Sequence, residues 1–391
     1  MRGGNREGAG RKLLPNSQKK YSKNIYMTKD MYTKINSLDL DECNNFSQKC
    51  IELIKIGLSE LNDFKRIKNN NEKSKSSHYS NDRMKRSKGK MTFIDLFAGI
   101  GGMRKGFEDK DTVCVFSSEW DKYATQTYEA NYGEFPQGDI TKIDASDIPN
   151  HDVLLAGFPC QPFSNIGKRQ GFGHETQGTL FFDVLRILKE KTPKMFLLEN
   201  VKGLLTNDKG NTFKVIIENL KQLNYSIFYD VLDAQNFGLA QRRQRVIIVG
   251  FREDLDVKYF EFPTGDQKRR IPISSILEKD PKGYKISKHL QKSYLFKKDD
   301  GKPQLVDFNS TIQVNTLVAT YHKIQRLTGT FVKDGETGLR LFSELELKRL
   351  MGFPDDFKVP VSRTQMYRQF GNSVAVPMIK AVADEMKKVV K

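Results

Sequence analysis

The residues best suited to chemistry in this sequence surround Cys160, which lies between two prolines in the segment 157–164, GFPCQPFS. Proline fixes its own backbone, so a cysteine flanked in this way is held rigidly. The thiolate is the nucleophilic form, and an ordinary thiol with a pKa of about 8.5 is only slightly ionised at neutral pH. The segment 241–245, QRRQR, can supply the positive charge that favours a thiolate. We therefore predict that Cys160 is a nucleophile, the alternative being a small buried apolar residue.

A second candidate is Glu199, which opens the segment 199–201, ENV, directly after an apolar run. A thiol that adds to a pyrimidine ring needs an acid beside it, because the ring is a poor electrophile until a ring nitrogen is protonated or hydrogen-bonded. An acidic residue at this kind of position can instead cap a helix. The pairing with Cys160 favours the role of an acid for Glu199 over that of a helix cap.

Three further signals, in chain order, predict a pocket for a nucleotide-like cofactor. The glycine-rich segment 95–102, DLFAGIGG, would let the backbone approach a ligand closely before a helix begins. Glu119 could accept hydrogen bonds from ribose hydroxyls, and Trp120 could stack on adenine. Asp139, in the segment 138–140, GDI, would follow a third strand and accept from the adenine amino group. Trp120 taken alone would indicate ordinary core packing, but the three signals together favour the pocket.

The elements that must position these residues are strands and helices in alternation. From residue 91 onward, short apolar runs alternate with helical periodicity, which predicts an α/β fold with a mostly parallel sheet. We expect strands at 92–96, 112–117, 152–156, 194–198, 225–232 and 245–250. Open sheets of this kind bind ligands at the carboxyl ends of their strands. Because the chemical segments lie next to expected strands, the sheet would gather them at one edge.

The first 90 residues differ in composition from the rest of the chain. The 391-residue sequence has a net charge of +17, and residues 1–90 carry 21 Lys and Arg against 10 Asp and Glu. A basic surface favours a polyanion such as nucleic acid, although a solvated basic tail is the alternative. We expect a disordered tail at 1–20 and a linker at 65–90. Between them, the strand–helix–helix order of 21–64 resembles a dimeric, DNA-binding ribbon-helix-helix module, although many small helical hairpins share it.

The location and metal content follow from what the sequence lacks. No apolar run approaches the roughly 18 residues of a membrane span, and the first residues show no secretory signal. The four cysteines form no close pairs, which fits a reducing compartment and argues against a metal site. We expect a cytoplasmic protein without membrane attachment and without a metal.

Seven segments now suggest a family. DLFAGIGG, EW, GDI, GFPCQPFS, ENV, QRRQR and GNSV at 371–374 follow one another in the order seen in bacterial DNA cytosine-5 methyltransferases, which this sequence resembles over residues 91–391. The resemblance implies a class I, Rossmann-like domain that binds S-adenosylmethionine. It implies as well that the protein associates with the nucleoid of a bacterial-type cell. It also implies a catalytic domain at 91–263, a smaller target-recognition domain at 264–341 and a return to the catalytic domain at 342–391.

The resemblance assigns roles to single residues. Cys160 would add to C6 of a cytosine flipped out of double-stranded DNA, and Glu199 would engage N3 and the exocyclic amine. Arg243 and Arg245 would hold and polarise the ring and help to position Glu199, and a mobile loop at 164–179 would close behind the base. The cofactor would be contacted by Phe97, Gly99, Gly101, Gly102, Glu119, Trp120, Asp139, Ile140, Pro159, Asn372 and Val374. DNA would be contacted by Gln161, Ser164, Thr316, Leu317, Lys323, Gln325 and Arg326.

The target site is suggested by the segments 290–303 and 320–335, which resemble those of CCGG-specific members of the family. This likeness implies the same target, with the outer cytosine modified. Lys323, Gln325, Arg326 and Asp334 have side chains suited to the base edges of a C/G site. Phosphate contacts or solvation are the alternatives for each of them.

Two other functions remain open. A cytosine-5 methyltransferase acting on transfer RNA could use a similar pocket, although the long basic recognition segment argues against it. A DNA-binding regulator could act through the N-terminal module, and both roles could coexist if residues 20–62 repress the protein's own gene. We expect the catalytic part to act as a monomer, the N-terminal module to be able to dimerise, and a cognate restriction endonuclease to be a plausible partner.

Overall fold

The computed structural model describes residues 89–159 and 180–390, together with Ile35 and Cys50, both of which are helical. The chain divides into two compact units, Met1–Ser74 and Lys75–Lys391. The expected strand and helices of residues 21–64 lie outside the described residues apart from those two positions. The catalytic elements all belong to the second unit.

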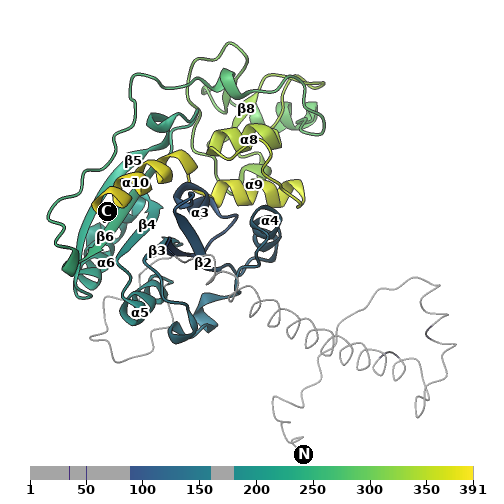
Figure 1. Ribbon diagram of the computed structural model, residues 1–391. Helices are drawn as coiled ribbons and strands as arrows, with labels where there is room; N and C mark the ends of the chain where they lie inside the picture. Colours follow the sequence, from purple (N-terminus) through teal and green to yellow (C-terminus); the bar gives the residue numbers. More distant parts are fainter. Residues whose placement is uncertain (1–34, 36–49, 51–88, 160–179, 391) are drawn as a thin grey trace, which may run out of the picture. The chain divides into compact units, whose positions relative to one another are not determined.

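The second unit is built on a six-stranded sheet with the order β2-β1-β3-β4-β6-β5 (Figure 1). Its strands are β1 (Met91–Leu96), β2 (Thr112–Ser118), β3 (Val153–Gly157), β4 (Met195–Val201), β5 (Tyr225–Asp233) and β6 (Gln244–Arg252). The first four pair in parallel, whereas β6 is antiparallel to both β4 and β5. All six predicted strands are present, and the mostly parallel α/β architecture is confirmed.

Helices cover both faces of this sheet because its central strands are apolar on both sides. Alternate strand residues pack under α5 (Phe181–Lys191) and α6 (Asn211–Lys221) on one face. The intervening residues pack under α3 (Gly102–Phe107) and α10 (Val376–Val389) on the other. Helix α10, near the end of the chain, therefore packs on the sheet to which β1 belongs.

A third apolar cluster lies beside the sheet and joins the segment after β6 to α8 (Glu344–Met351) and α9 (Arg363–Asn372). Regular structure there is sparse. It comprises α7 (Lys288–Leu290) with a π-helical turn at Gln291–Leu295, and the parallel pair β7 (Gln304–Val306) and β8 (Thr330–Val332). The remaining helix, α4 (Lys122–Tyr132), contributes Ala124 to this cluster.

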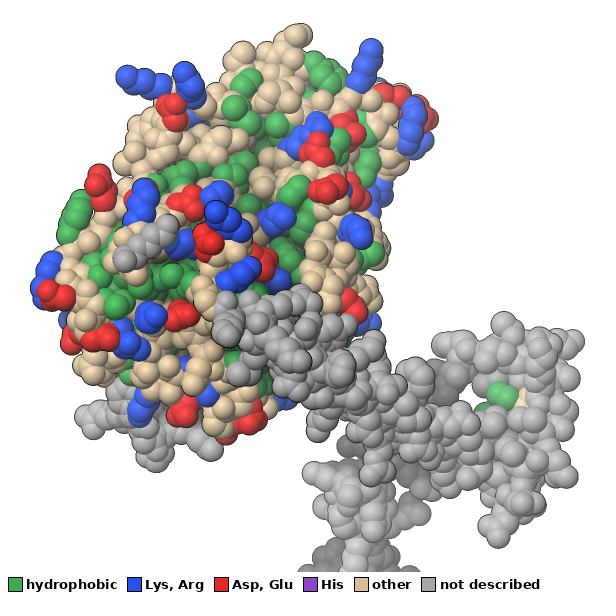
Figure 2. Space-filling view, in the orientation of Figure 1, with side chains coloured by type: hydrophobic (Ala, Val, Ile, Leu, Met, Phe, Trp, Pro, Cys, Tyr) green, Lys and Arg blue, Asp and Glu red, His purple; other side chains and the backbone are tan. Residues whose placement is uncertain are grey.

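Charged side chains of both signs are interspersed on the face shown in Figure 2, where they surround apolar side chains. In the parts of the chain that the structure describes, no helix has the length and apolar character needed to cross a membrane. The same residues hold no cluster of side chains that could ligate a metal ion.

Candidate active site

The end of β2 carries Glu119, whose carboxylate organises the neighbouring turn. Its two oxygens accept hydrogen bonds from the backbone N–H groups of Gly99, at 2.8 Å, and Asp121, at 2.7 Å. Burial raises the pKa of Glu119 above its ordinary value. Because each carboxylate oxygen can accept more than one hydrogen bond, Glu119 can still receive a ribose hydroxyl while holding the Gly99 turn in place.

Trp120, the next residue, is 79% exposed. The core-packing alternative for this side chain is therefore wrong. An indole presented to solvent directly beside a buried acid is suited to stack on a flat heterocycle, as expected for an adenine-binding position. Phe97, on the neighbouring turn, has a left-handed backbone with φ of 53° and packs in part against the sheet core.

The glycine-rich turn is shaped by what packs against it. Gly101 has φ of 80°, and its carbonyl accepts a hydrogen bond from the Tyr132 hydroxyl at 2.7 Å. A Cβ placed on Gly102 would lie 2.6 Å from Ser373 Oγ and 2.9 Å from Val374 Cγ2. Glycine is thus required at 102 for close contact with the C-terminal segment, in addition to any contact with a ligand.

The segment around Asp139 differs from expectation, because no regular strand precedes it. Gln137 makes only an isolated parallel bridge with Ser118, and the Asp139 carboxylate caps a 3-10 turn by accepting from Thr141 N at 3.1 Å. Partial burial would raise its pKa, but hydrogen bonds from Thr141 and Lys142 leave that pKa lowered. Ile140 is buried, and its carbonyl accepts from Arg186.

The nucleophile segment is described up to Pro159, which is exposed just after the end of β3. Phe158 is buried against Phe181, with ring centroids 5.5 Å apart, and its carbonyl accepts a hydrogen bond from Asn200 Nδ2 at 2.9 Å. Cys160, Gln161, Ser164 and the expected mobile loop at 164–179 lie outside the described residues. Asn200 therefore fixes the backbone that leads into the cysteine.

Glu199 lies beside this point, inside β4 and in register with Gly157. A Cβ placed on Gly157 would be 4.0 Å from Glu199 Oε2 and 3.9 Å from Val374 Cγ1. The acid, the start of the cysteine segment and the cofactor-side Val374 are therefore neighbours. Since Glu199 occupies a strand, the helix-cap alternative is wrong.

Arg245 forms an ion pair with Glu199, with 2.9 Å between Nε and Oε1. Among the described residues Oε1 has this ion pair but no hydrogen-bond donor, so it keeps an acceptor site for a ligand. Burial raises the pKa of Glu199, although the charges of Arg245 and Arg243 oppose that shift. The carboxyl group therefore holds its proton at higher pH than an ordinary glutamate and is suited to donate to a ring nitrogen.

The side chain of Arg243 is bound by backbone carbonyl groups of the protein itself. Its side chain is 1% exposed, and it donates hydrogen bonds to the carbonyls of Leu317 at 3.0 Å, Gly371 at 3.2 Å and Ser373. Burial, and then the charge of Arg245, lower its pKa to about 9. Arg245 lies against the acid as expected, whereas Arg243 is occupied by three backbone carbonyls. Asn372, between two of these carbonyl residues, is exposed.

Comparison with known proteins agrees with this arrangement. The family model of C-5 cytosine-specific DNA methylases matches residues 91–388. This chain belongs to that family. The Bacillus subtilis type II methyltransferase M.BsuFI is 69% identical over 397 residues, which cover 99% of this chain and 97% of that protein. The Moraxella type II methyltransferase M.MspI is 58% identical over 294 residues, which cover 75% and 70% of the two chains.

Solved structures show the same fold at low sequence identity. A Spodoptera frugiperda DNMT2 mutant matches this chain with a TM-score of 0.61 and 22% identity, covering 77% of this chain and all of that one. The S. pombe Dnmt2 methyltransferase matches with a TM-score of 0.62 and 20% identity, covering 76% and 99%. The family assignment makes this chain a DNA cytosine-5 methyltransferase, and the expected use of S-adenosylmethionine follows from the methyl transfer that defines the family.

In this methyltransferase, two of the residues expected to contact DNA are structural. The Leu317 side chain is 3% exposed, so it cannot reach a base edge. Arg326 is 8% exposed, and its guanidinium donates to the carbonyls of Leu295 and Lys298, each at 2.9 Å, and pairs with Asp300. The residue types suggested contact with DNA, but both side chains are buried in the protein interior.

Asp334 and Thr316 also have internal partners. Asp334 forms an ion pair with Arg340 Nε at 2.9 Å and accepts from Asp280 N at 2.7 Å. Thr316 Oγ1 donates to the Arg242 carbonyl at 2.7 Å. Lys323 and Gln325 are exposed on the turn that leads to β8, although Gln325 Oε1 accepts from the Thr320 and Thr328 hydroxyls. They remain the candidates for base contacts.

The structure adds Gln241, which the sequence interpretation left without a role. It is fully buried, donates from Nε2 to the Leu350 carbonyl at 2.6 Å and accepts from Leu317 N at 3.1 Å. The sequence signal for this role was the amide side chain at the start of QRRQR. A buried amide can donate to a carbonyl and accept from an N–H at the same time.

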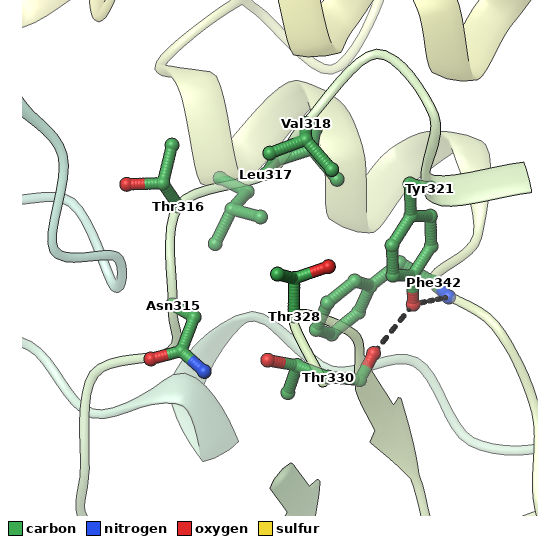
Figure 3. A pocket seen from close by; sticks show the side chains of 9 residues that line it. Asn315, Thr316, Leu317, Val318, Tyr321, Thr328, Thr330 and Phe342 are labelled. Atoms are coloured by element: carbon green, nitrogen blue, oxygen red, sulfur yellow. Dashed lines mark hydrogen bonds between the residues drawn. The ribbon is translucent and has the colours of Figure 1, made fainter. Parts of the chain in front are cut away.

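A small hollow is lined by residues 315–318 together with Tyr321, Thr328, Thr330, Phe342 and Leu350 (Figure 3). In it the Tyr321 hydroxyl donates to the Thr330 carbonyl at 2.7 Å and accepts from Phe342 N at 3.1 Å. The hydroxyl groups of Thr316, Thr328 and Thr330 donate to Arg242, Gln325 and Gln304, and most of the lining is apolar. We therefore interpret the hollow as a packing feature and place the chemistry at Glu199.

Proposed function

We propose that this DNA cytosine-5 methyltransferase modifies the outer cytosine of CCGG in double-stranded DNA, as the modification enzyme of a type II restriction-modification system. The observation that carries the chemistry is the buried Glu199–Arg245 pair beside Gly157, where the cysteine segment begins. The target site rests on the likeness of segments 290–303 and 320–335 to CCGG-specific family members. The restriction-modification role rests on the type II methyltransferases to which the chain is similar.

The proposed cofactor site is formed by the carboxyl ends of β1 and β2 together with the C-terminal segment. Glu119 would take the ribose hydroxyls, Trp120 would stack on adenine, and Asp139 would face its amino group. The remaining contacts would come from Phe97, Gly99, Gly101, Gly102, Ile140, Pro159, Asn372 and Val374. The fit is supported by the 79% exposure of Trp120 next to a buried acid. When bound, S-adenosylmethionine supplies an electrophilic methyl group on its sulfonium.

The proposed chemistry assigns one step to each side chain. The Cys160 thiolate adds to C6 of the flipped cytosine while Glu199 donates to N3, which places electron density on C5. Arg245 keeps Glu199 oriented and balances its charge once the proton has left. After C5 has taken up the methyl group, water accepts the C5 proton, the C5–C6 double bond re-forms as the Cys160 thiolate leaves, and N3 returns its proton to Glu199.

The proposed partners follow from the same assignment. The catalytic part would act as a monomer on duplex DNA in the bacterial cytoplasm, with Lys323 and Gln325 toward the bases. The residues of the N-terminal module would pair in a dimer, and a restriction endonuclease of the same specificity would be the cognate partner. No metal takes part in the proposed reaction.

The test is transfer of labelled methyl from S-adenosylmethionine to unmethylated duplexes that contain CCGG or a scrambled tetranucleotide, with transfer RNA as a third substrate. Label in CCGG alone, abolished in Cys160→Ala, is the expected result. Label in both duplexes would refute the CCGG assignment while keeping the enzyme. Label in transfer RNA alone would refute the DNA substrate.

A further inference from the structure

We infer that Arg243 is a positioning residue that couples the recognition segment, here residues 314–319, to the cofactor-side segment, residues 371–374. In this role the Arg243 guanidinium holds the backbone at Leu317 and the backbone at Gly371–Ser373 in one arrangement. Occupation of the DNA site would then be communicated to the cofactor site through these carbonyls. The inference rests on the proposed cofactor site, and the experiment below separates the two.

The first observation is the reach of this one side chain. Its partners lie 74, 128 and 130 residues away in sequence, and all of them are backbone carbonyls. A side chain that binds backbone on two separate segments fixes their relative position whatever side chains those segments carry. At 1% exposure, water cannot compete for these hydrogen bonds.

The second observation is independent of Arg243 and concerns Gly371. A Cβ placed on Gly371 would overlap Ala319 N and the Val318 carbonyl carbon, and it would lie 2.6 Å from Ala319 Cα. The end of α9 and the recognition segment therefore meet backbone to backbone at the point that Arg243 bridges. A displacement of one segment cannot be absorbed by side chains lying between them.

On the recognition side, the chain around Arg243 is paired to the segment that precedes Leu317. Arg242 N donates to the Val314 carbonyl at 2.9 Å, and Val314 N donates to the Ala240 carbonyl at 2.9 Å. Gln241 adds a contact to Leu317 N at 3.1 Å. A shift of the recognition segment is thereby transmitted to the backbone that carries Arg243.

On the cofactor side, the residue after Ser373 is Val374, which is 3.9 Å from the Cβ position of Gly157 and 2.9 Å from that of Gly102. Ser373 itself approaches the Gly102 position to 2.6 Å. The carbonyl that Arg243 holds at Ser373 therefore belongs to a segment packed against both the glycine-rich turn and the start of the cysteine segment. Arg243 controls the position of that segment.

A guanidinium suits this role better than any other side chain. It offers five N–H donors in one fixed plane and keeps its charge when buried, whereas an ammonium is a compact point charge on a flexible stem. Lysine at position 243 would retain charge and approximate length but lose the geometry that reaches two segments at once. Arg243→Lys therefore separates the bridging function from the charge.

The experiment uses Trp120 as a reporter, because it is the single tryptophan of the chain. S-adenosylhomocysteine is titrated into the full-length protein and the fluorescence of Trp120 is followed, with and without a duplex that the wild-type enzyme methylates. The coupling factor is the ratio of the two dissociation constants. Couplings between sites are typically about 5- to 150-fold. We expect a factor in this range for the wild type and a factor close to one for Arg243→Lys.

The matched control is Arg252→Lys, at the end of β6, where the arginine is half-buried, pairs with Asp254 and donates to the Thr192 carbonyl. It should retain the wild-type coupling factor. A well-folded Arg243→Lys with wild-type coupling would overturn the inference. A change in its cofactor affinity that is equal with and without DNA would also overturn it, since that result indicates a local structural role. Failure of Trp120 to respond in the wild type would instead refute the proposed cofactor site.

A measurement on the wild type keeps the inference testable if Arg243→Lys does not fold. Amide hydrogen exchange is compared with and without the same duplex, in the absence of cofactor. We expect DNA to slow exchange at residues 371–374 as well as at 317–319, because the two segments are held as one. Protection confined to 317–319 would overturn the inference.

Discussion

The buried carboxyl group of Asp95 should make the stability of the protein depend on pH, and the structure gives the direction of that dependence. Its carboxyl group is 0% exposed near the carboxyl end of β1, and among the described residues neither oxygen has a hydrogen-bond partner of acceptable geometry. Burial raises the pKa of Asp95 well above its ordinary value, against the opposing charge of Arg104. The folded protein therefore keeps a proton on Asp95 at pH values where the unfolded chain has lost it.

The sign follows from this difference in bound protons. Between the unfolded pKa of about 3.9 and the raised folded pKa, the folded state binds one proton more than the unfolded state, so stability falls as pH rises. The slope is about 1.4 kcal/mol for each pH unit. An asparagine side chain has no such proton to lose. The unfolding free energy of Asp95→Asn should therefore rise, relative to that of the wild type, by about 1.4 kcal/mol for each unit of pH increase within that window.

The assay is urea unfolding of the full-length wild type and Asp95→Asn at successive pH values from about 5 upward, compared through the difference in unfolding free energy. The difference should grow up to the folded pKa of Asp95 and level off above it. Asp139→Asn is the matched control. The lowered pKa of Asp139 means that this residue is ionised in both states throughout that range, so its difference should stay constant. An Asp95→Asn difference that does not change with pH, or that shrinks as pH rises, would refute the argument from burial.

Further predictions concern single contacts. Trp120→Ala should weaken S-adenosylhomocysteine binding by calorimetry about tenfold or more through lost stacking, yet leave stability unchanged because the indole is 79% exposed; weakening below twofold would contradict this. Glu199→Gln should lower methyl transfer by about 10²–10⁴-fold and abolish the decline in rate as pH rises through the raised pKa of Glu199. A variant that keeps the wild-type pH profile would argue against proton donation. Glu346→Gln breaks a buried pair, 2.8 Å from Arg340 Nη1, and should cost about 3 kcal/mol in urea unfolding. The exposed pair lost in Glu385→Gln should cost less than about 1 kcal/mol, and equal costs would be inconsistent with this reasoning. Arg326→Ala should destabilise the protein by about 1–3 kcal/mol, whereas Lys323→Ala should lower discrimination between CCGG and altered sites at unchanged stability. The reverse pattern would restore Arg326 as a base-reading residue.

The sheet could be predicted from the sequence because its central strands are buried on both faces. Each then appears as a short continuous apolar run, as at 152–156 and 194–198, and a run of this kind is hard to mistake. The pairing of Glu199 with Arg245 was predicted only through the family resemblance. It depends on the antiparallel pairing of β6 with β4, which brings the start of β6 beside the end of β4. The antiparallel direction of β6 leaves no comparable mark in the sequence.

The recognition residues were harder to predict because residue type alone does not fix exposure. Arg326 and Lys323 are both cationic and only three positions apart, yet one is 8% exposed and the other lies on the surface. Backbone carbonyls at Leu295 and Lys298 decide the difference, and carbonyls are present in every residue. Arg243 differed from expectation for the same reason, since its partners are backbone atoms of distant segments.

The position of α10 has a consequence for how the protein is made. Helix α10 covers the face of the sheet formed by residues such as Phe93, Val153 and Leu155. During synthesis at about 5–20 residues per second, β1 and β3 leave the ribosome well before Val376–Val389 do. Until then the nascent chain bears a bare apolar face, and Val374 has not reached the Gly157 edge. Translation arrested before α10 would therefore yield an aggregation-prone, inactive fragment, so that methylation of the host DNA begins only with chains whose last helix has been made.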